Sequence, residues 1–416
     1  MNICLLTAEY HTESFRTGGI GRAFGKMAHW FVDHGHQVLV IVSSTKDEEL
    51  IERPGIRVRR IATRSHMHWR LRPLINRLPR EVRELLWNRD TRATLADETA
   101  KAAVAGKADV VLTSPGLAEP LASRRVVPLV IRLQNPWREH ERAEFRRITL
   151  TSLLCACVEK RAAQYATRIY APSQESARKY HRLRTLPIPV IRTPMFPLEQ
   201  PGDWRAVALK YDLPDQFLLF TAGLLGSKGA HVLADALPEF FAQRPDTHAL
   251  LVGRTSKGPK GGAMDAYVRE RCRDFPLRLH ILPPVKHAEL FAMLQQARFV
   301  VQPTLVDNLP NALLEAMYFG RLIVASRGAS LDEILDDSDS LLVPPGDARA
   351  LVEAMLLADQ LSDKQRAELG AKAAKKVLRV CDPDTVMNQV VALCEEAIRD
   401  HGKCQRLETG GFRFFQ

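Results

Sequence analysis

Short apolar runs rich in branched residues alternate with longer helical segments along the chain, and this alternation constrains the fold more than any single motif. Residues 3–7 and 37–43 are two such runs, separated by a helical segment at 21–34 that ends at Gly35. Continuous apolar runs indicate parallel strands that are buried on both faces of a sheet. Further strands of this kind are expected at 109–113, 126–133 and 168–171. The first part of the chain therefore predicts a doubly wound α/β domain.

The same alternation restarts after a stretch in which proline is frequent. Proline restricts the chain to extended conformations, so residues 187–204 are interpreted as a hinge between two domains. Beyond the hinge, strands are expected at 217–221, 249–252, 277–282, 299–302 and 322–325, with helices at 231–241, 263–273, 287–297 and 310–319. A chain of 416 residues also exceeds what one hydrophobic core normally supports. The sequence predicts two α/β domains facing a central cleft, residues 1–195 and 205–385, with residues 386–416 crossing back onto the first.

The composition limits the cellular location and the partners. Seven scattered cysteines without a Cys-x-x-Cys pair argue against a disulfide framework or a structural zinc. No stretch reaches the roughly eighteen apolar residues of a membrane span, and the first apolar run lacks a basic leader, so a soluble cytoplasmic protein is expected. The net charge of +11 favours an anionic partner. Because no basic stretch is interleaved with stacking aromatics, no nucleic acid partner is expected.

The basic segment at residues 64–92 leaves two interpretations open. It carries eight arginines among leucines and tryptophans. A basic amphipathic segment of this kind can lie on an anionic membrane, which would make the protein peripheral on the inner face of the membrane. Alternatively, the segment packs its own leucines onto the first domain.

The helix that is expected to begin at Pro310 has well-defined ends. Proline is favoured at the first helical position, Asp307 or Asn308 is expected to cap the helix, and Gly320 ends it. Residues 312–314 and 316–319 are apolar all round, which indicates a buried helix, and Glu315 is its only carboxylate. A carboxylate in such surroundings needs a partner. The partner is either a structural ion pair or a ligand hydroxyl or backbone donor.

A phosphate site is expected in front of this helix. The N-terminus of a helix that follows a strand directs free N–H groups at a ligand and favours negative charge. Lys228 lies in the loop after the strand at 217–221 and is expected at the same edge of the sheet, where its ammonium can neutralise a diphosphate. The alternative is an ordinary solvated loop lysine.

The glycines Gly18, Gly19, Gly21 and Gly25 do not form a dinucleotide-binding fingerprint. About ten residues separate them from the first strand, and no acidic residue follows the second strand to hold a ribose. They form either a loop whose backbone approaches a ligand or a tight turn. The Asp-x-Asp pairs at 337–339 and 382–384 are interpreted as turns and helix caps, and the histidines lack metal-ligand spacing, so no metal is expected.

Taken together, these motifs resemble the retaining glycosyltransferases of family 4, which have the GT-B fold of two facing Rossmann-like domains. The resemblance covers nearly the whole chain. It rests on TAEYHTESFRTGGIGRAFGKMAHWFVDHGHQVLVI, Ala171-Pro172-Ser173, GLLGSKGAHVLADALPEF and PTLVDNLPNALLEAMYFGRLIVASRGASLDEIL, continuing to LLVPPGD. It implies transfer of a sugar from a nucleotide-diphosphate sugar to a hydroxyl of a glycan or lipid-linked acceptor in polysaccharide biosynthesis. It also implies retention of configuration, no metal, and no cofactor, since the nucleotide sugar is a substrate.

The resemblance implies a role for each matching residue. Glu315 binds the nucleotide ribose, and Asp307 stands where the family has its sugar-contacting glutamate. The amides of Asn308 and Leu309 meet the diphosphate, with Lys228 and the backbone of Gly19 completing the cradle. The catalytic candidates are Lys228, Asp307 and Glu315, and the donor site is expected to comprise Gly18, Gly19, Gly223, Lys228, Asn308, Leu309, Pro310, Asn311 and Glu315.

Three departures from the family pattern keep other functions open. Asp307 is one methylene shorter than the usual glutamate, and Leu224 occupies the place of a phosphate-binding arginine. Gln134 or Asn135, on the acceptor side, stands where members often carry a histidine. A catalytically attenuated nucleotide-sugar or glycan-binding protein of the same fold is therefore a second interpretation. A third, a sugar-nucleotide isomerase, lacks an identifiable acid and base.

Overall fold

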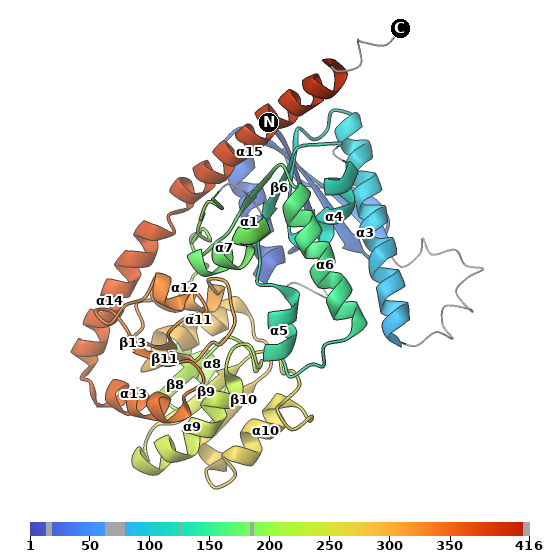
Figure 1. Ribbon diagram of the computed structural model, residues 1–416. Helices are drawn as coiled ribbons and strands as arrows, with labels where there is room; N and C mark the ends of the chain where they lie inside the picture. Colours follow the sequence, from blue (N-terminus) through green and yellow to red (C-terminus); the bar gives the residue numbers. More distant parts are fainter. Residues whose placement is uncertain (14–18, 63–79, 125, 184–186, 411–416) are drawn as a thin grey trace.

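The computed structural model describes residues 1–13, 19–62, 80–124, 126–183 and 187–410. Two α/β domains, each built around its own sheet, make up this part of the chain (Figure 1). The predicted fold class, two doubly wound domains, is confirmed. Most of the basic segment 64–92 lies outside the described residues, and only its part from Arg80 onward is placed, in a helix. None of the helices in the described ranges is both long and apolar enough to cross a bilayer.

The first sheet has the order β3-β4-β2-β1-β5-β6-β7. Its strands are β1 (Asn2–Thr7), β2 (Gln37–Ser44), β3 (Glu48–Arg53), β4 (Ile56–Ala62), β5 (Val110–Thr113), β6 (Leu129–Arg132) and β7 (Arg168–Tyr170). All neighbours pair in parallel except β3 and β4. The helices are α1 (Gly19–Asp33), α3 (Arg80–Val104), α4 (Pro115–Arg124), α5 (Trp137–Ala143), α6 (Leu150–Tyr165) and α7 (Gln174–Tyr180), followed by the short 3-10 helix η1 (His181–Leu183).

The second sheet is parallel throughout, in the order β10-β9-β8-β11-β12-β13. Its strands are β8 (Phe217–Phe220), β9 (His248–Val252), β10 (Leu279–Leu282), β11 (Phe299–Gln302), β12 (Ile323–Ser326) and β13 (Leu341–Val343). The helices are α8 (Trp204–Tyr211), α9 (Ala230–Gln243), α10 (Met264–Arg271), α11 (His287–Gln296), α12 (Asn311–Tyr318), α13 (Ala348–Gln360) and α14 (Asp363–Val380), with 3-10 turns η2 (Pro276–Arg278) and η3 (Leu331–Glu333). Strands β8, β9, β11 and β12 are almost wholly buried, as parallel strands covered on both faces must be.

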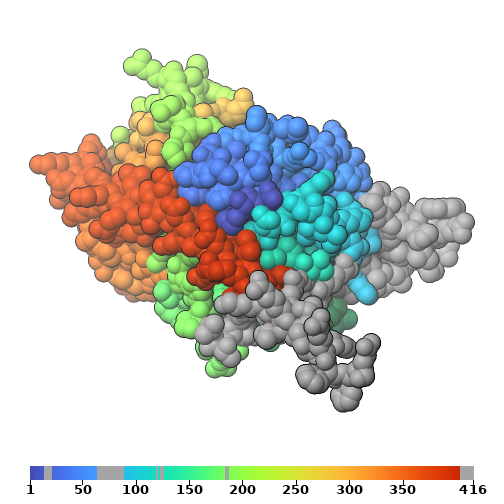
Figure 2. Space-filling view, turned by 90° about the horizontal axis from the view of Figure 1, so that it is seen from above, coloured from blue at the N-terminus to red at the C-terminus, as the bar shows by residue number. Residues whose placement is uncertain are grey.

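The last helix, α15 (Pro383–Gly410), returns to the first domain. Its apolar side chains Val386, Met387 and Val390 belong to the same buried cluster as strands β1 and β2. At its start, the indole N–H of Trp30 donates to the Asp384 carboxylate at 2.7 Å. Figure 2 shows this helix, in red, lying against the blue and cyan first domain. The C-terminal helix, which follows the second domain in sequence, therefore packs against the first domain.

Candidate functional site

A cleft of about 1130 Å³ lies between the two domains and is lined by both of them and by the linker. From the first domain it receives side chains of the loop after β1, of α1 and of the segment after β6, and from the second those of the loop before α9 and of α12 with its preceding loop. Of the residues singled out from the sequence, it brings together Gln134, Asn135, Lys228, Asp307, Asn308, Leu309, Pro310, Asn311 and Glu315.

The start of α12 differs from the expectation. Pro310 is the cap residue, no side chain accepts a hydrogen bond from the first turn, and the helix proper begins at Asn311. Asp307 and Asn308 therefore do not cap the helix. Leu309 adopts the left-handed backbone conformation, with φ of 57°, which is rare for a branched residue and turns the chain sharply into the helix.

The amides of Asn308 and Leu309, expected to meet a diphosphate, already have partners. The Asn308 N–H donates to Asp307 Oδ1 at 2.7 Å, and the Leu309 N–H donates to the buried Ser330 hydroxyl at 2.7 Å. Both amides are therefore engaged within the protein in this structure, and their contact with a diphosphate stays a prediction. The first turn of α12 remains as the anion-attracting end, with Asn311 and Ala312 lining the cleft.

Lys228 and Asp307 form an ion pair inside the cleft. Both side chains are only 18% exposed, so the alternative of a solvated loop lysine is wrong. Burial lowers the pKa of the Lys228 ammonium to about 8, and the nearby Glu144 carboxylate opposes that shift. Below this pH the Lys228 ammonium is charged, and it is paired with the Asp307 carboxylate.

Glu315 lies on the cleft side of α12, one turn beyond the start of the helix. Burial raises the pKa of its carboxyl to about 7, and the positive charges of Arg22 and Lys26 oppose the shift. Both cations come from α1 of the first domain and line the same cleft. A carboxylate whose charge is destabilised in this way is a strong acceptor for a hydroxyl donor that enters the cleft.

The side chain of Asn308, in the second domain, forms hydrogen bonds with residues of the first domain. The Ser173 hydroxyl donates to Asn308 Oδ1 at 2.8 Å. Asn308 Nδ2 in turn donates to the Leu133 carbonyl at 3.2 Å and to the Ser176 hydroxyl at 3.3 Å. The loop before α12 is thus held in place by the first domain.

A second bridge holds the loop before α9. The Glu144 carboxylate, from the first domain, accepts hydrogen bonds from the amides of Gly226 at 3.3 Å and Ser227 at 2.9 Å. At Gly226 any side chain would collide with the Ala143 carbonyl, 2.1 Å from the position of a Cβ. Sequence inspection missed Glu144 because its partners lie more than eighty residues away.

The other residues predicted from the sequence lie partly inside and partly outside the cleft. Gly223 and Leu224 do not line the cleft; Leu224 is buried in the core of the second domain. Asn135 lines the cleft and its side-chain oxygen accepts from Lys179 at 3.1 Å. Gly18 lies outside the described residues, and Gly19 is the first residue of α1.

Gly21 and Gly25, from the same glycine-rich stretch, have a packing role. A Cβ on Gly21 would come within 3.0 Å of the Glu9 carbonyl carbon, and one on Gly25 within 2.1 Å of the His11 ring. The two glycines lie one turn apart on α1 and let the loop after β1 approach the helix closely.

Two further ionisable groups in the cleft carried no signal in the sequence. Burial raises the pKa of Glu159, on α6, to about 7, against an opposing hydrogen bond from the Trp137 amide. Burial lowers the pKa of His140, on α5, with Glu144 opposing. Neither residue belongs to a motif in the sequence, and only the folded structure shows that they line the cleft.

Comparison with known proteins adds an independent line of evidence. Residues 18–198 match the glycosyl transferase 4-like domain, and residues 215–358 match the glycosyl transferases group 1 domain. The phosphatidyl-myo-inositol mannosyltransferase of Mycolicibacterium smegmatis is 30% identical over 194 residues, which are 44% of this chain and 47% of that protein. The O-antigen chain mannosyltransferase C of Escherichia coli is 30% identical over 195 residues, 45% of this chain and 47% of that protein. The matched part spans about half the length of these relatives.

Solved structures share the fold over nearly the whole chain. Sucrose-phosphate synthase from Thermosynechococcus elongatus superposes with a TM-score of 0.71 at 17% identity, covering 96% of this chain and 99% of that one. Anabaena HepE, solved in complex with UDP and glucose, superposes with a TM-score of 0.66 at 19% identity, covering 94% of this chain and 98% of that one. The two matched domains place the chain in the family 4 (group 1) glycosyltransferases, and the solved structures show that it shares their GT-B fold.

Proposed function

We propose that this chain transfers a sugar from a nucleotide-diphosphate sugar to a hydroxyl of a glycan or lipid-linked acceptor, with retention of configuration. The observation that carries the proposal is the meeting of Lys228, the N-terminus of α12 and Glu315 in one interdomain cleft. Among the relatives, several are mannosyltransferases by name, so a mannosyl donor is the first candidate.

The spacing along α12 suits a nucleoside diphosphate. Glu315 lies four residues after Asn311, which is about 6 Å along a helix axis. A diphosphate at the helix N-terminus therefore leaves the attached ribose within reach of the Glu315 carboxylate. Lys228 faces the same end of the helix through its contact with Asp307, so its ammonium can neutralise the phosphates.

Lys228 and the helix N-terminus then act on the leaving group. Departure of a nucleoside diphosphate places growing negative charge on the phosphate oxygens, and fixed positive charge stabilises that state more than the ground state. Attack by the acceptor hydroxyl on the same face, assisted by the departing phosphate, needs no separate nucleophile and gives retention. The proposed transfer also needs no divalent ion between the phosphates, and added Mg²⁺ is expected to leave the rate unchanged.

Replacing Asp307 by asparagine tests the ion pair directly. The change removes the carboxylate that neutralises Lys228 and keeps the side-chain shape, so binding of a free nucleoside diphosphate is expected to tighten several-fold. Sugar transfer is expected to slow at least about 10-fold, because Asp307 is proposed to contact the donor sugar. Calorimetry with UDP and GDP, together with initial rates, measures both effects. Weaker nucleotide binding in the variant would assign Asp307 to holding the loop instead.

A donor panel tests the proposed function. Thermal-shift measurements with UDP-, GDP- and ADP-sugars, GDP-mannose among them, are expected to identify one stabilising donor. Slow hydrolysis of that donor, or transfer to a lipid-linked or oligosaccharide acceptor, is the expected turnover. Binding without hydrolysis or transfer over a broad acceptor panel would favour the attenuated binding protein. Contact of residues 64–92 with the inner face of a membrane stays a prediction.

A further inference from the structure

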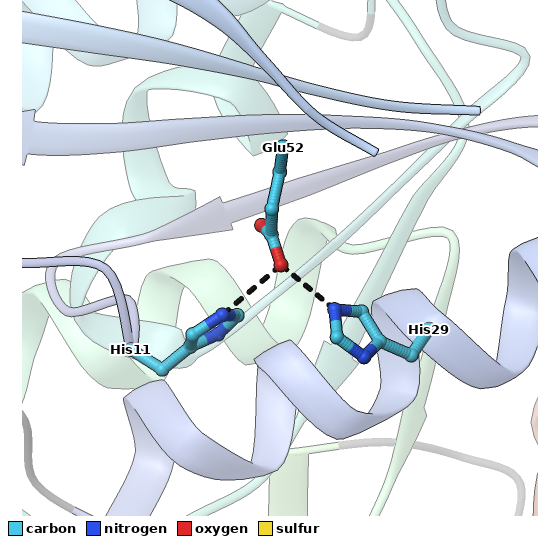
Figure 3. A group of neighbouring side chains, drawn as sticks. All are labelled: His11, His29 and Glu52. Carbon is cyan, nitrogen blue, oxygen red and sulfur yellow. Dashed lines mark hydrogen bonds and ion pairs between the residues drawn. The ribbon is translucent and has the colours of Figure 1, made fainter. Parts of the chain in front are cut away.

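Three side chains of the first domain converge beside the cleft, and two of them, His11 and His29, line it (Figure 3). His11 comes from the loop after β1, His29 from α1 and Glu52 from β3. Glu52 Oε1 lies 3.0 Å from His11 Nε2 and 2.7 Å from His29 Nε2. The two imidazoles thus direct the same ring nitrogen at a single carboxylate oxygen.

Neighbouring residues orient Glu52 and limit the space on one side of the His11 ring. The hydroxyl of Tyr10, whose side chain is fully buried, donates to the other oxygen of Glu52 at 2.8 Å. The His11 ring occupies space that any side chain at residue 25 would fill, because a Cβ on Gly25 would lie 2.1 Å from His11 Nδ1. A hydrogen bond to the distal carboxylate oxygen is the kind of support that orients metal ligands in proteins.

We propose that His11, His29 and Glu52 form a binding site for one Zn²⁺-type divalent ion, with a fourth position open to the cleft. Two imidazole nitrogens and one carboxylate are the donor set of zinc sites that keep an exchangeable position. The ligand atoms of the three residues all lie within 4.8 Å of one another. Among the described residues, no other group of three histidine, cysteine or acidic side chains brings its ligand atoms this close together.

The distances require little movement to admit the ion. Ligand atoms about 2.1 Å from a tetrahedral zinc are about 3.4 Å apart. The observed separations from Glu52 Oε1 are 3.0 and 2.7 Å, so the imidazoles have to retreat by about 0.4 and about 0.7 Å. The side chains of His11 and His29 are 32% and 43% exposed, which leaves them free to make that adjustment.

The fourth coordination position of the ion is expected to face the cleft, because two of the three ligands line it. His11 and His29 line it, whereas Glu52 lies behind them and is 14% exposed. Water is the expected fourth ligand. A divalent ion with one carboxylate leaves a net positive charge on this wall, which would favour an acceptor that carries a phosphate. That last consequence rests on the proposed function, whereas metal binding itself does not.

Zinc titration of metal-free protein tests the proposal. Protein dialysed against a chelator is expected to bind one Zn²⁺ per chain in calorimetry. His29→Ala and Glu52→Gln are expected to weaken that binding by at least about 100-fold, since each removes a ligand. His181→Ala, at an exposed histidine at the end of α7, is the matched control and is expected to bind as the unchanged protein does.

Cobalt in place of zinc distinguishes this site from the cysteines. Four-coordinate Co²⁺ held by nitrogen and oxygen gives visible absorption without a thiolate charge-transfer band. Circular dichroism verifies that His29→Ala, at a half-exposed helical position, remains folded. Equal zinc binding by the unchanged protein and His29→Ala, or no binding by either, would overturn the proposal and leave a hydrogen-bonded brace. Donor binding is measured separately, so its loss or retention does not affect this result.

Discussion

Replacing Lys228 by alanine is expected to lower the rate of sugar transfer by about 10²- to 10³-fold, the usual effect of removing one preorganised group that stabilises developing negative charge. Removing one partner of a buried ion pair lowers stability, so circular dichroism is used to verify that the variant remains folded. Loss of the ammonium leaves Asp307 without its ion-pair partner beside the departing phosphate. Initial rates with the donor identified by thermal shift measure the effect.

The pH dependence gives this prediction a second readout. Because burial lowers the pKa of Lys228 to about 8, the ammonium is present below that pH and is lost above it. The kcat/KM for the donor, which reports the free protein, is expected to fall as pH rises through about 8. The alanine variant should lack this decline, whereas Lys228→Arg should retain activity to higher pH.

A matched control comes from the same domain. Lys210 on α8 is about half exposed and forms an ion pair with Glu289, 2.6 Å away, outside the cleft. Lys210→Ala is expected to leave the rate and its pH profile unchanged. Near-normal transfer by Lys228→Ala would remove the assignment of Lys228 to the diphosphate.

Replacing Glu315 by glutamine is expected to separate donor binding from stability. Hydrogen bonds to a charged acceptor contribute about 1.5–3 kcal/mol, so donor affinity should weaken by roughly 10- to 100-fold. The folded protein, however, should become more stable at alkaline pH. Burial holds the pKa of Glu315 near 7, above its ordinary value, so ionisation of this group opposes folding.

The sign of the stability effect follows from proton linkage. A carboxyl whose pKa is raised on folding carries no penalty below the pKa of the unfolded chain, and its full penalty above that of the folded chain. Glu315→Gln should therefore raise the free energy of unfolding by about 1–3 kcal/mol at pH 8, and the gain should vanish as pH falls toward 4.5. Urea unfolding at both pH values measures it.

Glu239 provides the control for this substitution. It is an exposed residue of α9, and Glu239→Gln is expected to change neither donor affinity nor the pH dependence of unfolding. If Glu315→Gln left donor affinity unchanged but altered stability as described, Glu315 would be a buried group without a ribose contact.

The strands and helices of the two sheets were largely predictable, because burial on both faces leaves a continuous apolar run in the sequence. Strand β11 has the expected bounds, Phe299–Gln302, and α11 differs from its expected range by one residue. The β3–β4 hairpin was not anticipated. Strand β3, EELIER, lies at the edge of the sheet, is only partly buried and is rich in charge, so it lacks the apolar signal of the others.

The candidate site was predictable only in part, and the division has a physical cause. Residue type and helix position were sufficient to predict that Lys228 and Glu315 lie at the carboxyl edge of the second sheet. The hydrogen-bond partners of the backbone were not predictable, because they are chosen by distant residues. Ser330 takes the Leu309 amide, and Ser173 holds the Asn308 side chain across the domain boundary.

The sequence by itself determined the two-domain α/β fold and the family, since periodicity of burial and the order of motifs are local properties of the chain. Only the tertiary structure decided which charges meet: Lys228 with Asp307, Glu144 with the loop at 226–227, and His11 with His29 and Glu52. Electrostatic and hydrogen-bond partners act over a few ångströms in space and leave no periodic signal in the sequence. The chemistry of the cleft therefore depends on how the folded segments bring these groups together.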